Sequence, residues 1–119
     1  MSPAEPLGLS YLDALFGALR DAGQELDAAQ RWIAAAEQAR VPVFRLQSLA
    51  VAGRAHAAAR ACLDDADVRL AHLGRRGDLP PPLDQIPDRI DAARAALRTV
   101  EERLVRAALD AATGPLGQA

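Results

Sequence analysis

The segment SYLDALFGALRDAGQELDAAQRWIAAA, residues 10–36, decides the fold. Its apolar residues recur at alternating intervals of three and four, which is the spacing of one stripe along an α-helix. The stripe consists of Leu12, Leu15, Leu19, Ala22, Leu26, Ala29, Ile33 and Ala36. Because Ser10 is a good N-cap residue, the pattern predicts one amphipathic helix over residues 10–40, about 45 Å long.

Two later segments repeat this alternation. The stripe of residues 43–74 consists of Leu49, Ala52, His56, Ala59, Leu63, Ala66, Leu70 and Leu73. The stripe of residues 83–112 consists of Leu83, Ile86, Ile90, Ala93, Leu97, Val100, Leu104, Ala107 and Ala111. Gly74 is a typical residue after a helix end, and acidic residues at the start of the last segment suit a helix N-terminus.

The predicted fold is therefore all-α, with three long antiparallel helices in a left-handed coiled-coil-like bundle. Aromatic residues make up only 3% of the chain, so strands are not expected. One domain spans residues 10–112, with helices over 10–40, 43–74 and 83–112. Residues 1–9 and 113–119 contain proline and glycine and are expected to be flexible tails; both contain Pro-Leu-Gly, whose role the sequence leaves open.

The sequence determines one of the two segments between the helices better than the other. The segment GRRGDLPPPLD, residues 74–84, is a loop because three consecutive prolines adopt extended backbone. At ARVPVF, residues 39–44, Pro42 disfavours helical geometry at Val41. A tight hairpin corner is favoured there, and the alternative is one kinked helix of about 60 residues, about 90 Å long.

Alanine dominates the predicted core, with 28 copies in the chain. In the first two stripes one seam position is mostly leucine or isoleucine and the other is mostly alanine. Small residues let two helix backbones approach closely, so the first two helices are expected to pack tightly. The third helix has bulkier seam residues and is expected to lie in the groove between them.

The second helix is apolar on more than one side. A further stripe consists of Val51, Ala55, Ala58 and Cys62, and a third of Ala50, Ala57, Ala61 and Ala71. A helix that is apolar nearly all round is usually buried all round, so Val51, Ala55, Ala58 and Cys62 are predicted to form a homodimer interface. The alternative is that surface alanine here only favours helix formation.

Charge excludes some classes of partner. The net charge is −2, which gives no general attraction to nucleic acid or anionic lipid. Residues 42–77 carry +3, from six arginines and three aspartates, between acidic neighbours, which fits pairing within a bundle. All 14 cations are arginine, a composition typical of GC-rich bacteria. No apolar stretch is long enough for a membrane span and no basic leader is present, so a cytoplasmic protein is expected.

Few residues suggest chemistry. His56 is interpreted as a core imidazole hydrogen-bonded to a neighbouring helix, at Glu25 or Gln30, and alternatively as a ligand-binding group. Trp32 is either a clamp over the core edge or an anchor for a partner. His72 fits a helix-terminus cation, and Cys62 fits a buried apolar residue.

Asp64, Asp65 and Asp67 fit solvated helix charges, with Asp65 paired to Arg69 at i,i+4.

The sequence contains no phosphate-binding loop, catalytic triad pattern or metal-ligand pattern, so no cofactor, metal or enzymatic activity is expected. The predicted function is a non-catalytic interaction or scaffolding module that homodimerises through the second helix and contacts another protein. The alternative is a small ligand-binding regulatory bundle with a pocket near His56 and Trp32.

Overall fold

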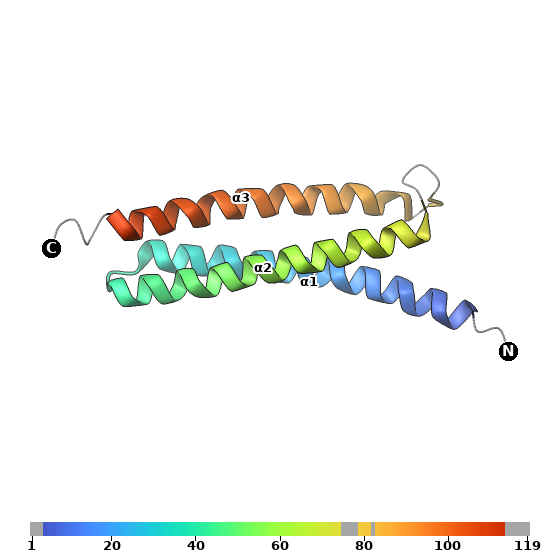
Figure 1. The fold of residues 1–119 in the computed structure, drawn as a ribbon, viewed down its shortest axis with the longest axis horizontal. Coiled ribbons are helices and arrows are strands. Elements are labelled where there is room, and N and C mark those ends of the chain that lie inside the picture. Colours follow the sequence, from blue (N-terminus) through green and yellow to red (C-terminus); the bar gives the residue numbers. More distant parts are fainter. Residues whose placement is uncertain (1–3, 75–78, 82, 114–119) are drawn as a thin grey trace.

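The computed structural model describes residues 4–74, 79–81 and 83–113, with side chains from Tyr11 onward. It contains helix α1 (Ala4–Gln38), helix α2 (Pro42–Leu73), a short 3-10 turn η2 (Leu83–Gln85) and helix α3 (Ile86–Thr113). The described residues contain no strand, so the all-α prediction is confirmed. The helices form an elongated bundle measuring 69 × 28 × 17 Å (Figure 1).

Helix α1 begins earlier than the predicted residue 10. It starts at Ala4, so Ser10 lies inside the helix rather than at its cap. Pro6 is compatible with this start because the first turn of a helix needs no backbone N–H donor. Residues 4–9 are thus helical rather than a tail, while residues 1–3 and 114–119, including the second Pro-Leu-Gly, lie outside the described residues.

Pro42 makes a corner between two helices and not a kink in one. Val41 has φ −93° and ψ 122°, the extended conformation that a following proline favours, and α2 begins directly after it. Across the corner, Nη2 of Arg45 donates to the carbonyl oxygen of Ala39 at 2.8 Å. This bond satisfies a carbonyl that the end of α1 leaves without an intrahelical donor. Figure 1 shows the chain reversing direction here.

The connection from α2 to α3 begins at Gly74. Its backbone N–H donates to the carbonyl oxygen of Leu70 at 3.3 Å, and its φ of 148° is a conformation that glycine adopts readily. Leu79 is buried against the core. Helix α3 starts at Ile86 rather than at 83, because Pro87 has no N–H to bond the carbonyl of Leu83. Residues 75–78 and 82 of this loop lie outside the described residues.

Helices α1 and α2 pack closely through alanine, as predicted. These two helices contact each other more extensively than either contacts α3. The fully buried alanines at their seam, each 0% exposed, are Ala22, Ala29, Ala52, Ala59 and Ala66. Larger seam residues such as Leu15, Ile33 and Leu63 are also fully buried, so the predicted stripes form the core.

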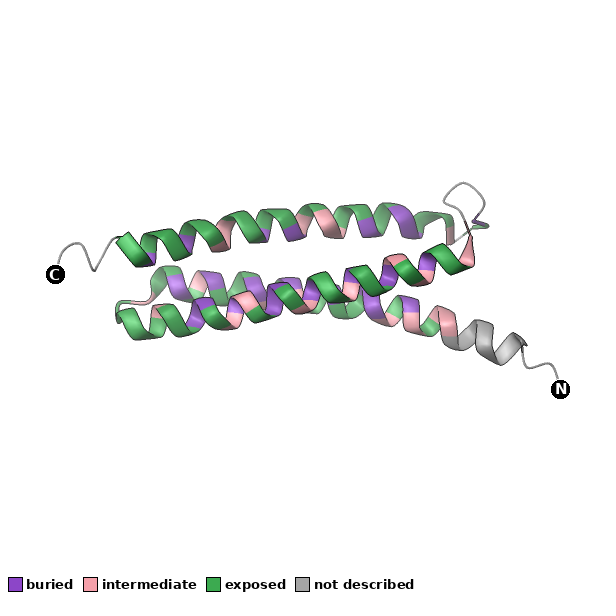
Figure 2. Ribbon diagram, viewed as in Figure 1, coloured by how far each residue is buried: buried purple, intermediate pink, exposed green. Residues whose placement is uncertain are grey.

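Helix α3 lies along the α1–α2 hairpin and contacts both of its arms (Figure 1). Its core residues include Ile90, Leu97 and Val100, while Leu104 is only half-buried. In Figure 2 the buried positions follow the side of each helix that faces its neighbours. The outer sides of all three helices are exposed, and the outer side of α2 is where the charged residues are fewest.

Candidate functional site

The predicted interface stripe of α2 is partly covered within the chain itself. Ala55 is buried, at 7% exposed, and Val51, Ala58 and Cys62 are half-buried. Burial raises the pKa of the Cys62 thiol above its ordinary value, and the carboxylates of Asp21 and Glu25 raise it further. Because those two acids belong to α1, this stripe lies at the border between the two arms of the hairpin.

Beside that border is a groove of about 600 Å³. Trp32 of α1 contributes one wall, and the corner end of α2 contributes the rest: Phe44, Gln47, Ser48, Ala50, Val51 and Arg54. Trp32 is 42% exposed and Phe44 is 58% exposed. Ile33, the next residue, is fully buried at the seam, while the exposure of Trp32 places its ring at the surface of the hairpin.

His56 lies in the core and not in this groove. It is 8% exposed, and its Nε2 has no hydrogen-bond partner among the described residues. The expected hydrogen bond to Glu25 or Gln30 is therefore not made by this nitrogen. The groove beside Trp32 does not include His56, so the two residues proposed to share a pocket are not brought together by it.

The outermost positions of α2 are largely alanine and valine. Ala50, Ala57, Ala61 and Ala71 are exposed, and Val68 is 56% exposed. Val43 and Leu46, near the start of the helix, are also exposed. Exposed Arg54, Arg60, Asp64 and Asp65 flank this apolar strip, and the described residues do not cover it.

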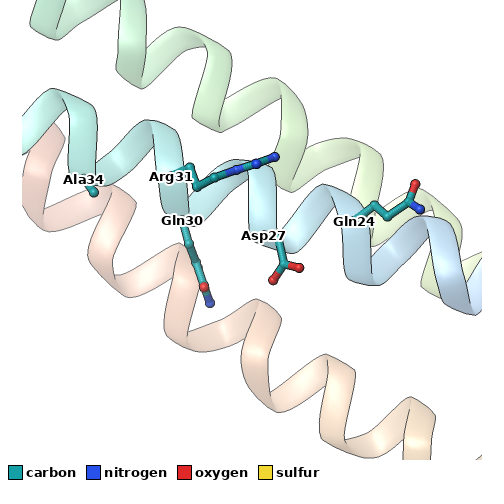
Figure 3. A pocket seen from close by; sticks show the side chains of 5 residues that line it. All are labelled: Gln24, Asp27, Gln30, Arg31 and Ala34. Atoms are coloured by element: carbon teal, nitrogen blue, oxygen red, sulfur yellow. The ribbon is translucent and has the colours of Figure 1, made fainter.

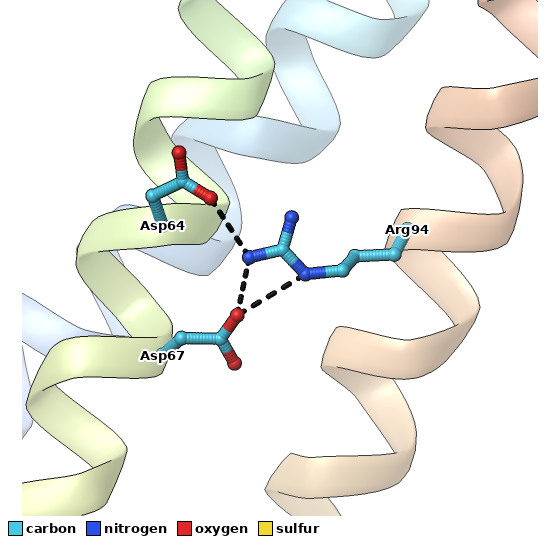
Figure 4. Close-up of polar contacts among 3 residues, drawn as sticks. All are labelled: Asp64, Asp67 and Arg94. Carbon is cyan, nitrogen blue, oxygen red and sulfur yellow. Dashed lines mark hydrogen bonds and ion pairs between the residues drawn. The ribbon is translucent and has the colours of Figure 1, made fainter.

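An ion cluster that the sequence did not reveal joins α2 to α3 (Figure 4). Arg94 donates from Nη2 to Asp64 at 2.9 Å and from Nε to Asp67 at 3.1 Å, and also bonds Asp67 through Nη2. The hydrogen bonds to Asp67 and Asp64 raise the pKa of Arg94 above its ordinary value. The available signal was the i,i+3 spacing of two aspartates, which puts two carboxylates on one side of a helix.

Other polar contacts lie within α2 or join one helix to another. Arg69 bonds Asp65 at 2.8 Å, the predicted i,i+4 pair, and stacks 5.4 Å from the centre of the Tyr11 ring. His72, in the last turn of α2, donates from Nδ1 to the carbonyl oxygen of Val68 at 2.7 Å. Arg103 of α3 pairs with Glu37 of α1 at 3.0 Å.

Other hollows also lie among the described residues. Figure 3 shows one along α1, about 470 Å³, where Asp27 and Gln30 extend from the helix in the same direction. Another, about 510 Å³, lies on α3 around Val105 and Leu109. A third, about 260 Å³, lies where Glu37, Arg45 and Asp110 meet at one end of the bundle. None combines a nucleophile with a supporting base.

Among the described residues, there is no group of three or more histidine, cysteine, aspartate or glutamate side chains that could hold a metal ion. In the same part of the chain, no helix has the length and apolar character needed to cross a bilayer. No protein family model matches the chain, and comparison with curated proteins and with solved structures finds no match.

Proposed function

We propose that the protein is a non-catalytic interaction or scaffolding module that homodimerises through α2 and offers its other surfaces to a second protein. The observation that carries this proposal is the strip of exposed alanine and valine on the outer side of α2, which the described residues leave uncovered. Removal of apolar surface from water favours association, and lost rigid-body freedom and side-chain ordering oppose it. Two-fold pairing is the commonest assembly and needs no additional component.

We also propose how the three helices are oriented and twisted around one another. The three helices are antiparallel and supercoil with a left-handed twist, as the alternation of three and four residues favours. The cytoplasm is the proposed location, and the unpaired Cys62 fits a reducing compartment.

The test is the mass of the chain in solution over a micromolar concentration series, by sedimentation equilibrium. The expected result is a dimer that the exposed variant Ala61→Glu and the half-buried variant Ala58→Glu both convert to monomer. Ala95→Glu places the same side chain on the exposed side of α3 and is the matched control. A wild-type chain that stays monomeric across this concentration series contradicts the proposal.

A second candidate is a regulatory bundle that binds a small apolar ligand, favoured by the volume of the groove beside Trp32. Trp32 is the single tryptophan of the chain, so its fluorescence reports on that groove directly. A dye for apolar surfaces such as ANS is expected to change the Trp32 emission under this candidate, and to bind dimer and Ala61→Glu monomer alike. Under the homodimer proposal, ANS is expected to bind the groove beside Trp32 in the Ala61→Glu monomer and not in the dimer.

A further inference from the structure

The uncovered side of α2 carries a second regular seam. Its residues follow one another at intervals of four and three, and each is exposed or half-buried in the chain: Gln47, Val51, Arg54, Ala58, Ala61, Asp65, Val68 and His72. This outer seam shares Val51 and Ala58 with the predicted interface stripe. It runs for about 38 Å along the helix, which is about four-fifths of its length.

We propose that a second copy of this chain docks antiparallel along the outer seam, with the two-fold axis midway between residues 59 and 60. This rests on the proposed function and specifies its register. About that axis each residue meets a different one: Gln47 meets His72 of the partner subunit, Val51 meets Val68, Arg54 meets Asp65 and Ala58 meets Ala61. The pairs are polar with polar, apolar with apolar and cation with anion throughout.

The charges support this register. Arg54 has no ion-pair partner among the described residues. Asp65 bonds Arg69 through Oδ2, so its second carboxylate oxygen can accept from the guanidinium of the partner subunit's Arg54. Two-fold symmetry forms this ion pair twice. In a parallel pairing Arg54 would face Arg54 and Asp65 would face Asp65, and like charges would oppose the association.

The shape of the seam supports it as well. At the centre, Ala58 and Ala61 are small and let two helix backbones approach closely. Toward one end, Gln47, Val51 and Arg54 form a wall of the groove beside Trp32. The docked copy seats its Val68, which is 56% exposed in the single chain, in that groove beside the indole.

Gln47 and His72, the first and last residues of the outer seam, also fit this register. His72 already donates from Nδ1 to the carbonyl oxygen of Val68. Its Nε2 is therefore the nitrogen that accepts from the side-chain amide of the partner subunit's Gln47.

The test uses two charge-reversal variants, Arg54→Asp and Asp65→Arg. Each alone sets like charges opposite one another at both symmetric positions, so each is expected to weaken the homodimer by about tenfold or more. Mixed in equal amounts, the two variants restore both ion pairs in a heterodimer, whose dissociation constant is expected within about threefold of the wild-type value. Arg98→Glu, an exposed reversal on α3, is the control and leaves the dimer intact.

Sedimentation equilibrium gives the masses, and the Trp32 emission is expected to shift to shorter wavelength as the wild-type dimer forms. Circular dichroism of each variant at low concentration checks that its helices are retained. Variants that dimerise as well as the wild type, or a mixture that fails to restore association, overturn the register. If Ala61→Glu still gives a monomer in that case, the α2 homodimer stands and only its register is wrong.

Loss of the dimer in Arg98→Glu places the interface on α3 and overturns this inference. A wild-type monomer overturns both the register and the proposed function.

Discussion

At the scale of single residues, His56 is the unusual member of the core. It occupies a seam position between Ala52 and Ala59, both 0% exposed, and its Nε2 lacks a hydrogen-bond partner among the described residues. A buried polar atom without a partner loses its hydration and gains nothing in return. The stripe in the sequence correctly predicts that His56 points into the core. It does not predict the missing bond, because that depends on how the facing side chains of α1 are turned.

We therefore expect His56→Leu to raise the free energy of unfolding by about 1–2 kcal/mol, because leucine needs no hydrogen bond in the core. Urea denaturation followed by circular dichroism measures the change. His56→Ala is the companion variant, and it is expected to be less stable than His56→Leu because it leaves a cavity. A loss of stability in His56→Leu would show that the imidazole contributes an interaction that leucine cannot replace.

At the scale of helices, the ends are set by prolines and by one glycine. Pro42 begins α2 at the predicted corner and Gly74 follows its last residue, because both act through local backbone geometry. The start of α1 was predicted six residues too late, since a proline in the first turn of a helix resembles a proline in a loop when only the sequence is read. The corner is completed by Arg45, whose bond to Ala39 joins residues that no sequence pattern links.

The end of α2 gives a prediction of its own. Gly74 has φ 148° and ψ 176°, a region of backbone conformation open almost only to glycine. Gly74→Ala is expected to lower the free energy of unfolding by about 1–3 kcal/mol through backbone strain. The added Cβ would lie 3.7 Å from Cδ2 of Leu79, an ordinary contact, so crowding is not the cause. Thermal denaturation of both Gly74→Ala and Gly23→Ala measures the change. A Cβ added at Gly23 would meet no atom within 4 Å, so Gly23→Ala reports the general effect of replacing a glycine without strain.

If Gly74→Ala is as stable as the wild type while Gly23→Ala raises stability, the strained conformation at residue 74 is relieved without cost and the prediction fails.

At the scale of the whole molecule, the three helices differ in how much of their apolar surface is buried. The seams of α1 and α2 are buried along most of their length, whereas in the second half of α3 Leu104 is half-buried and Val105 and Leu109 are exposed. The sequence predicts the core of each helix well, because each stripe follows helical periodicity. It does not fix which side of α2 is covered by α3, since α2 is apolar on several sides and its pattern favours no single orientation. The contacts that accompany this orientation include Arg94, whose two aspartates are 27 and 30 residues away and which no local pattern links to it.

Hydrogen exchange is expected to reflect this difference. Amides of α3 from residue 98 to 113 should exchange faster than those of α1 from residue 15 to 36, because local opening is easiest where few apolar residues are buried. Comparison of α1 with α3 avoids α2, whose amides a dimer would also protect. Equal protection of the two helices, measured by mass spectrometry, would contradict a loosely held α3.

The ion pairs of α3 constrain how the hairpin can move. Near its start α3 pairs with α2 through Arg94, and farther along it pairs with α2 again through Glu101 and with α1 through Arg103. Sliding of one hairpin arm along the other would lengthen the Arg94 or the Arg103 contact. Helix α3 therefore links the two arms at the surface, and its ion pairs, each worth about 1 kcal/mol or less, oppose that sliding only weakly.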